Sequence, residues 1–439
     1  MSLPIEEIKS ELINSLTSND LVLLSAPPGS GKSTCLPLWF INKAKVEKSK
    51  IIMLQPRRVA AKSVANYLAY QLGEDVGQTI GYSVKNDSKL SRQTVLHVVT
   101  EGILTLMLQD DPELSSVNLI IFDEFHERSL QSDLAFALAR DCQQGFREDI
   151  TLLLMSATLD KELIDSHLSN VPLIESKGRS FPIDIVYSPP NQFSLWRQHM
   201  VNSIANWIKE GQGSALAFLP GSADIRAIYD DLQGKYEYQI DIYPMYGDLP
   251  LKEQQKAISP AKPAARKLVL ATNIAETSIT IEGVTTVFDS GLEKVASFNK
   301  SRLVNQLQQR QICKASAIQR AGRAGRTEPG QCIRIYSEED FSRRPLQSGT
   351  DIKQSDLIPL VTQVARWGTT ECRQLPFVEL PEPTSETHAW QTLSELKIVN
   401  DRRQLTPHGK QVVALPCHPR FGHMLISAIE IAQNESRPD

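Results

Sequence analysis

Residues 26–33 read Ala-Pro-Pro-Gly-Ser-Gly-Lys-Ser and lie between a short apolar run and a helix-like stretch. A P-loop has this setting: successive backbone N–H groups surround a phosphate, and the N-terminus of the next helix adds a favourable dipole. Lys32 would reach the outer phosphates, and Ser33 would give a hydroxyl to Mg²⁺. Ala26 departs from the motif, which has glycine there, but the flanking strand and helix argue against a chance glycine-rich loop. The phosphate-binding residues that we expect are Gly29, Ser30, Gly31, Lys32, Ser33 and Thr34.

Two carboxylates, Asp123 and Glu124, end a second apolar run at 119–122. The carboxyl ends of parallel strands line the ligand crevice of an open α/β sheet. Asp123 would hold Mg²⁺ through water. Glu124 would contribute to the metal site and would orient and deprotonate the attacking water. Adjacent carboxylates are often a solvated turn, but the apolar run before them and the P-loop upstream favour a catalytic pair.

A third group combines one glutamine with three arginines at a spacing of three or four residues: Gln319, Arg320, Arg323 and Arg326. This spacing predicts several of these side chains on one face of a helix, where guanidinium groups suit a polyphosphate. A charged surface helix held by salt bridges is the alternative. Gly322 and Gly325 argue against it, because each glycine weakens a helix by ~1 kcal/mol.

The elements that would position these groups alternate between short apolar strands and helices. This pattern predicts α/β domains with parallel sheets covered on both faces. A proline-rich stretch at 171–190 separates two such series. Helices alone are expected after about residue 345, including helices at 355–367 and 385–397. The expected strands are 21–24, 51–54, 95–99, 119–122 and 152–155, then 215–219, 267–271, 285–289 and 332–336.

The composition is that of an ordinary globular protein, with 439 residues, 41% hydrophobic residues and a net charge of −4. The whole-chain charge gives no sign of nucleic-acid binding, so a polyanion site would have to be a local basic groove. Six scattered cysteines without a CxxC pair favour reduced thiols over disulfides or zinc. No signal peptide or apolar run of ~18 residues is evident, so we expect a cytoplasmic protein without a membrane span.

Taken in order, the motifs resemble those of the DEAH/RHA helicases of superfamily 2. The sequence Asp-Glu-Phe-His at 123–126 resembles the DEAH box, with phenylalanine at its third position. That variant and the following Glu-Arg-Ser point to the bacterial HrpB-type branch. The other matching stretches are 55–58 (motif Ia), 100–102 (motif Ib), 156–158 (motif III), 218–221 (motif IV), 271–280 (motif V) and 319–326 (motif VI).

The resemblance implies four parts for the chain. Residues 1–175 would form RecA-like domain 1 and residues 176–345 RecA-like domain 2. Residues 346–415 would form a winged-helix domain, and 416–439 would begin a helical ratchet-like region that the chain does not complete. A strand-separating β-hairpin would lie at 292–312.

The resemblance also assigns roles around the nucleotide. Arg323 and Arg326 would be arginine fingers from the second domain, and Gln319 would help to place the attacking water. His126 would be linked to the nucleic-acid groove through Ser156 and Thr158. The base would lie between Tyr67 and Ile258, where eukaryotic members have arginine and phenylalanine, so ATP-only specificity is not expected. Residues near the ribose would be Ser278, Thr280 and Glu282.

Nucleic acid would lie across both sheets, held by its backbone and therefore without base specificity. The expected contacts are Arg57, Arg58, Thr100, Thr272 and Asn273. We therefore expect a monomeric RNA helicase motor that hydrolyses ATP or another NTP with Mg²⁺ and acts on single-stranded RNA. Two alternatives stay open: a DNA helicase on the same engine, and a nucleotide-dependent scaffold without unwinding. The sequence identifies no protein partner, and the chain alone is expected to unwind poorly.

Overall fold

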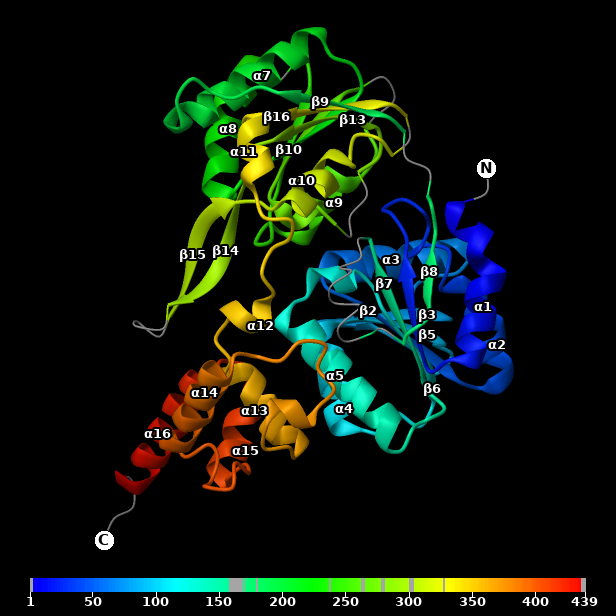
Figure 1. Ribbon diagram of the computed structural model, residues 1–439, viewed down its shortest axis with the longest axis vertical. Coiled ribbons are helices and arrows are strands. Elements are labelled where there is room, and N and C mark those ends of the chain that lie inside the picture. Colours follow the sequence, from blue (N-terminus) through cyan, green and yellow to red (C-terminus); the bar gives the residue numbers. More distant parts are fainter. Residues whose placement is uncertain are drawn as a thin grey trace.

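A computed structural model of the chain contains two α/β domains and a smaller helical domain (Figure 1). The structure describes residues 3–157, 168, 170–178, 181–236, 238–261, 265–277, 281–299, 304–326 and 328–435. Three residues that were predicted for the site or its motifs lie outside the described residues: Thr158, Ser278 and Thr280.

The first α/β domain is built on an eight-stranded sheet in the order β4-β3-β5-β2-β6-β7-β1-β8. All neighbouring pairs are parallel except β3 and β4. The five predicted strands form within a residue or two of their expected bounds. The strands are β1 (Leu21–Ser25), β2 (Lys50–Gln55), β3 (Ile80–Val84), β4 (Asp87–Lys89), β5 (Leu96–Thr100), β6 (Val117–Phe122), β7 (Thr151–Ser156) and β8 (Leu173–Glu175).

Successive residues of the central strands enter two different cores, because side chains alternate between the faces of a strand. Ile51 and Met53 pack on the face covered by the N-terminal helices. Ile52 and Leu54 pack on the opposite face. The covering helices are η1 (Pro4–Ile8), α1 (Lys9–Ser18), α2 (Leu38–Glu47) and α3 (Arg58–Gln71) on one face, and α4 (Glu101–Asp110) and α5 (Leu130–Gly145) on the other.

The second α/β domain has a six-stranded, all-parallel sheet in the order β11-β12-β10-β13-β16-β9. An antiparallel hairpin, β14 (Leu292–Asn299) with β15 (Val304–Gln311), extends from it and confirms the hairpin expected at 292–312. The sheet strands are β9 (Ile183–Tyr187), β10 (Ser214–Phe218), β11 (Asp241–Met245), β12 (Lys267–Ala271), β13 (Val284–Asp289) and β16 (Gly330–Arg334). The helices are α7 (Trp196–Glu210), α8 (Ser222–Tyr236), α9 (Leu251–Ile258), α10 (Lys314–Ala321) and α11 (Glu338–Arg343).

The helical domain shares a core with the first α/β domain. Leu104 and Leu138 of α4 and α5 belong to the same buried cluster as Val361 and Trp390. The second domain has its own clusters, one of which includes Val59 of α3, so its packing against the rest is less continuous. The helices of the helical domain are α12 (Asp351–Gln354), α13 (Ile358–Trp367), α14 (Pro383–Glu395), α15 (Pro407–Val413) and α16 (Pro419–Glu435).

The helix expected at 355–367 begins later than predicted, so its predicted start was wrong. The chain turns after Gln354, and a new helix begins at Ile358. The Asp356 side chain accepts a hydrogen bond from the Ile358 N–H at 3.0 Å. A side chain that satisfies a free N–H in this way favours a helix start over a helix interior.

Candidate active site

The phosphate loop follows β1, as the sequence predicts. Ala26 continues the extended course of the strand, and its N–H donates to the Ser156 carbonyl at 2.9 Å. A β-carbon is therefore accommodated where the motif has glycine. Gly29 and Gly31 have φ angles of 85° and 98°, a conformation that favours glycine. Ser30 is 1% exposed, and its Oγ has no hydrogen-bond partner among the described residues, so this buried hydroxyl is available to a ligand.

The helix expected directly after the loop starts later than predicted. Residues 32–37 form turns, and α2 begins only at Leu38. Pro37 explains the delay, because proline has no N–H to complete the helical hydrogen bond to Ser33. The N–H groups of Cys35 and Leu36 instead share the Gly31 carbonyl, at 2.8 and 3.4 Å.

Lys32 and Ser33 meet the two carboxylates that end β6. Lys32 Nζ lies 2.8 Å from Glu124 Oε2 and 3.9 Å from Asp123 Oδ1. The Ser33 hydroxyl donates to Asp123 Oδ2 at 2.5 Å. A hydroxyl beside a carboxylate is a set of hard oxygen donors of the kind that Mg²⁺ prefers.

Gln55 is a member of this cluster that the sequence reasoning missed as a site residue. It ends β2, which pairs with β6 so that Leu54 lies opposite Phe122. Its Nε2 donates to Asp123 Oδ2 at 2.6 Å, and the residue is 1% exposed. Its place at the carboxyl end of the neighbouring strand was the available signal.

Burial and charge separate the two carboxylates. Burial, reinforced by the neighbouring Glu124 charge, raises the pKa of Asp123 above its ordinary value. Burial also opposes ionisation of Glu124, but the charge of Lys32 and its hydrogen bond outweigh burial and lower the pKa of Glu124. Glu124 is held in a left-handed conformation with φ of 54°, which sets its carboxylate at the sharp turn after the strand.

The arginines of the third group are not placed as the helical spacing predicted. Helix α10 ends at Ala321 and Gly322 is its C-cap, so Arg323 and Arg326 lie in the following turn. Gly322 therefore lies at the end of the helix and not in its interior. The expectation that several of these side chains share one helix face was therefore wrong.

Arg323 and Arg326 nevertheless lie close enough to the first domain for their charges to act on it. Glu124 and Arg323 interact electrostatically across the domain boundary, and the Glu124 charge also acts on Arg326. Burial lowers the pKa of Arg326 to about 10 and that of Arg323 also falls, for the same reason. Arg323 Nε donates to the Glu276 carbonyl at 3.0 Å, which fixes the guanidinium within motif V.

Arg320 has a different position. It is 0% exposed and donates to Glu276 Oε2 at 2.8 Å and Asp289 Oδ1 at 2.9 Å. Its guanidinium lies 4.9 Å from the centre of the Phe218 ring. These contacts join motifs IV, V and VI inside the second domain, so Arg320 is a structural residue and does not face the phosphate loop.

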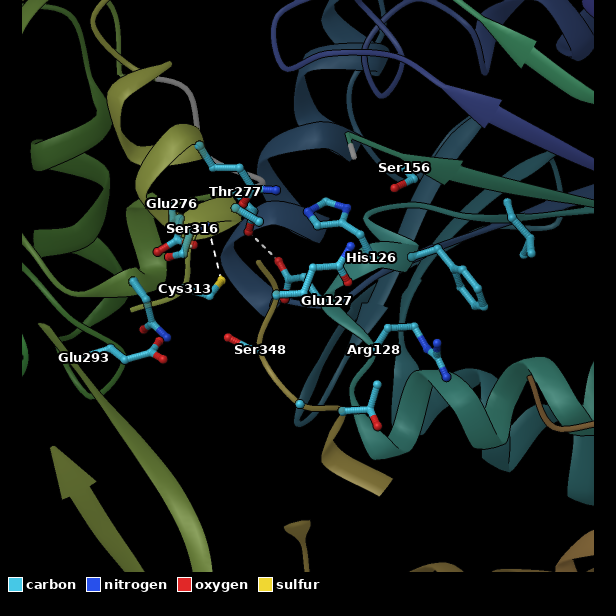
Figure 2. Close-up of a pocket in the computed structure, with 18 of the residues that line it drawn as sticks. His126, Glu127, Arg128, Ser156, Glu276, Thr277, Glu293, Cys313, Ser316 and Ser348 are labelled. Atoms are coloured by element: carbon cyan, nitrogen blue, oxygen red, sulfur yellow. Dashed lines mark hydrogen bonds between the residues drawn. The ribbon is translucent and has the colours of Figure 1, made fainter. Parts of the chain in front are cut away.

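His126 lies with Gln319 and Ser156 on a cavity of about 260 Å³ between the domains (Figure 2). The Ala157 N–H donates to His126 Nδ1 at 3.3 Å, and burial lowers the His126 pKa. Both observations favour the neutral ring. The lining of the cavity includes no residue of the phosphate loop, so the cavity is distinct from the phosphate site.

The cavity also brings together two predicted nucleic-acid contacts. Arg57 Nη1 donates to the Asn273 carbonyl at 2.9 Å, and Arg57 Nη2 lies 3.4 Å from Glu127 Oε1. Thr277 donates to the same Glu127 oxygen, a contact drawn in Figure 2. Glu127 and Thr277 were not predicted as site residues, and only the tertiary structure identifies them.

The remaining predicted residues are more scattered. Arg58 is exposed at the start of α3, while Thr100 and Thr272 precede α4 and η4 (Asn273–Ala275).

The described residues predicted near the base and the ribose do not meet. Tyr67 on α3 is 47% exposed, and Ile258 packs against the core of the second domain. Glu282 is exposed in the turn before β13, and its charge acts on Lys267. No direct contact places these three residues together within the described part of the chain.

The P-loop, the paired carboxylates and the arginines of a second α/β domain define the class of the helicase motors. Two family models match the chain: "DEAD/DEAH box helicase" over residues 6–166 and "Helicase conserved C-terminal domain" over residues 198–328. The chain belongs to the DEAD/DEAH box helicase family.

Within this family the chain is similar to the ATP-dependent RNA helicase HrpB of Escherichia coli (strain K12), with 42% identity over 427 residues, 97% of this chain and 52% of that protein. It is 33% identical over 431 residues to the ATP-dependent RNA helicase HrpA of Borreliella burgdorferi, which covers 97% of this chain and 52% of that protein. The crystal structure of Escherichia coli DEAH/RHA helicase HrpB superposes with a TM-score of 0.90 at 42% identity, covering 97% of this chain and 54% of that chain.

These similarities confirm the predicted fold class: two tandem RecA-like P-loop domains followed by a winged-helix domain. The chain spans about half the length of these relatives. Among the helices that the structure describes, none has the length and apolar character needed to cross a membrane.

Proposed function

We propose that the chain is the NTP-hydrolysing motor of an RNA helicase, with ATP or another NTP bound between the two RecA-like domains. One observation supports this most directly. Lys32 and Ser33 of the phosphate loop contact Glu124 and Asp123 at the end of β6, at 2.8 and 2.5 Å. The buried arginines of the other domain, Arg323 and Arg326, lie within reach of the Glu124 charge. A phosphate-binding loop, a carboxylate base and arginine fingers are the parts of a phosphoryl-transfer site.

In this proposal each residue has a defined task. Lys32 leaves Glu124 for the outer phosphates. Without this cation the pKa of Glu124 rises, and its carboxylate accepts the proton of the attacking water. Arg323 and Arg326 stabilise the charge that develops on the transferred phosphoryl group. Gln319 helps to place the water, and neutral His126 links the site to Ser156.

Mg²⁺ fits the oxygen donors of Ser33 and Asp123, which lie 2.5 Å apart, with Glu124 next to them. When bound, the metal neutralises charge on the triphosphate and polarises its oxygens. Gln55 and Ser33 hold Asp123 in position for this task.

The free thiols of all six cysteines support the proposed cytoplasmic location, where thiols stay reduced.

We further propose single-stranded RNA as the partner, held by Arg57, Arg58, Thr100, Thr272 and Asn273. The two named relatives are RNA helicases, which supports RNA over DNA for this chain. Contacts to phosphates from side-chain and backbone groups predict little sequence preference. The base would contact Tyr67 and Ile258, with Ser278, Thr280 and Glu282 near the ribose, and this loose site predicts turnover of several NTPs.

The test is the NTPase rate with and without poly-U or poly-dT. Stimulation by poly-U supports the proposal, while equal or greater stimulation by poly-dT supports a DNA helicase. Nucleotide binding with turnover indifferent to both polymers supports the scaffold alternative. Lys32→Ala should lose NTP binding, and a wild-type level of turnover in this variant would refute the assigned site.

A further inference from the structure

The N-terminal residues 3–5 cover one side of the phosphate loop. Ile5 is 0% exposed, and its N–H donates to the Ser30 carbonyl at 3.1 Å. A β-carbon on Gly31 would stand 2.9 Å from Leu3 Cδ1 and 3.0 Å from Ile5 Cγ2. Residues far upstream of every recognised motif therefore contact the centre of the loop.

The hydrogen bond from Ile5 sets the orientation of one peptide group. In a planar trans peptide, the carbonyl of Ser30 and the N–H of Gly31 point in opposite directions. Because the carbonyl points toward Ile5, the Gly31 N–H points away from the N-terminal segment. A phosphate loop requires its N–H groups to face the ligand, since a carbonyl turned toward a phosphate would repel it.

Glycine makes this orientation easy to lose. Gly31 has φ of 98°, and without a side chain it can rotate its peptide at small steric cost. Hydrogen bonds within the loop hold the Gly31 carbonyl, whereas Ile5 holds the Ser30 carbonyl. Leu3 and Ile5 also fill the space on the side where a β-carbon would lie. The buried Ile5 also anchors the segment in the same core as Ala26 and Leu36, which flank the loop.

We propose that Leu3 and Ile5 are positioning residues of the nucleotide site: they fix the Ser30–Gly31 peptide so that the Gly31 N–H faces the phosphates. This inference rests on the proposed nucleotide binding and adds to it a part of the chain that carries no motif. It predicts that the N-terminal segment determines phosphate affinity without contacting the nucleotide.

The test compares Ile5→Ala with Ile8→Ala in the full chain. Both isoleucines lie in η1 and in the same core, at 0% and 9% exposure, but it is the Ile5 side chain that lies against Gly31. Alanine keeps the backbone N–H, so Ile5→Ala removes the packing that holds this N–H against the Ser30 carbonyl. The dissociation constant of a fluorescent ADP with Mg²⁺ is measured together with the unfolding temperature of the free protein. Pyrophosphate, which has no base, is used as a competitor.

Ile5→Ala should weaken the binding of both ADP and pyrophosphate about tenfold, the size expected for one hydrogen bond to a charged group. Ile8→Ala should lower the unfolding temperature while leaving both affinities within about twofold of wild type. Leu3→Ala serves as a second test variant in which a folding defect is not expected, because Leu3 is 36% exposed. It should weaken binding in the same direction without changing stability.

Three results would overturn the inference. Equal affinities in wild type, Leu3→Ala and Ile5→Ala would show that the segment has no role in the site. Equal losses of affinity in Ile5→Ala and Ile8→Ala would show a general packing effect. A wild-type chain that binds neither ADP nor pyrophosphate would reject the proposed function as well, so the two failures are distinguishable.

Discussion

Arg320 and Arg323 lie in the same motif, yet the structure predicts opposite effects for their substitution. Arg320 is 0% exposed between Glu276 and Asp289, and Asp289 is itself 0% exposed. Replacing Arg320 by methionine keeps the side-chain length but leaves these carboxylates without their cation. Breaking a buried pair in this way costs about 3–5 kcal/mol. For a unit of ~150–250 residues, that corresponds to a fall of about 6–20 °C in its melting temperature.

The assay is thermal and urea unfolding of Arg320→Met, Arg323→Met and a control, Arg343→Met. Arg343 and its partner Glu339 are 76% and 72% exposed, so this ion pair should contribute less than about 1 kcal/mol. We expect Arg320→Met to be strongly destabilised, and Arg323→Met to remain folded but lose turnover by about 10³-fold or more, as for a lost arginine finger. If Arg320→Met melted within about 2 °C of wild type, the structural role assigned to Arg320 would be refuted.

Three further predictions concern the site and its surroundings. Glu124→Gln should bind NTP but lose turnover, and single-turnover hydrolysis at the wild-type rate would contradict its role as the base. Glu127→Gln should tighten binding of single-stranded RNA about two- to fivefold, because Glu127 competes with phosphate for Arg57. Fluorescence anisotropy should show no such gain in an Arg57→Ala background, and an equal gain there would exclude competition. Burial raises the pKa of Glu101 from 4.5 to about 8, so its stabilising contribution is complete below pH 4.5 and is lost as the pH rises through 8. Melting curves between pH 5 and 9 should show that Glu101→Gln abolishes this decline, and parallel pH profiles would argue against it.

The sheet cores were predictable because each buried parallel strand is a short run of apolar residues. The runs at 21–24, 51–54 and 119–122 became β1, β2 and β6. Strands such as β9 and β11 were not predicted. Both contain polar or partly exposed residues and lie at the edges of the second sheet, where one side has no neighbouring strand to bury.

Local sequence also determined which residue types meet at the phosphates. A loop after β1 and a carboxylate pair after β6 must lie at the same sheet edge, because all strands between them run parallel. That constraint brought Lys32 within 2.8 Å of Glu124, although the two are 92 positions apart.

Sequence spacing alone could not determine which arginines are structural and which lie near the phosphate site. The helical period predicted that several of these side chains share one helix face, but α10 ends at Ala321. Whether a guanidinium is buried among carboxylates or faces another domain depends on its neighbours in space, such as Asp289 for Arg320 and Glu124 for Arg323. Those neighbours come from distant parts of the chain.

The sequence by itself therefore determined the chemistry: a glycine-rich loop for phosphate, paired carboxylates for metal and water, and arginines for developing charge. These depend on residue type and on the order of strands. Only the tertiary structure decided which polar groups share a partner, as Gln55 does with Asp123, Glu127 with Arg57 and Ile5 with Ser30. Such contacts join separate elements, and their geometry is set by packing that no local pattern encodes.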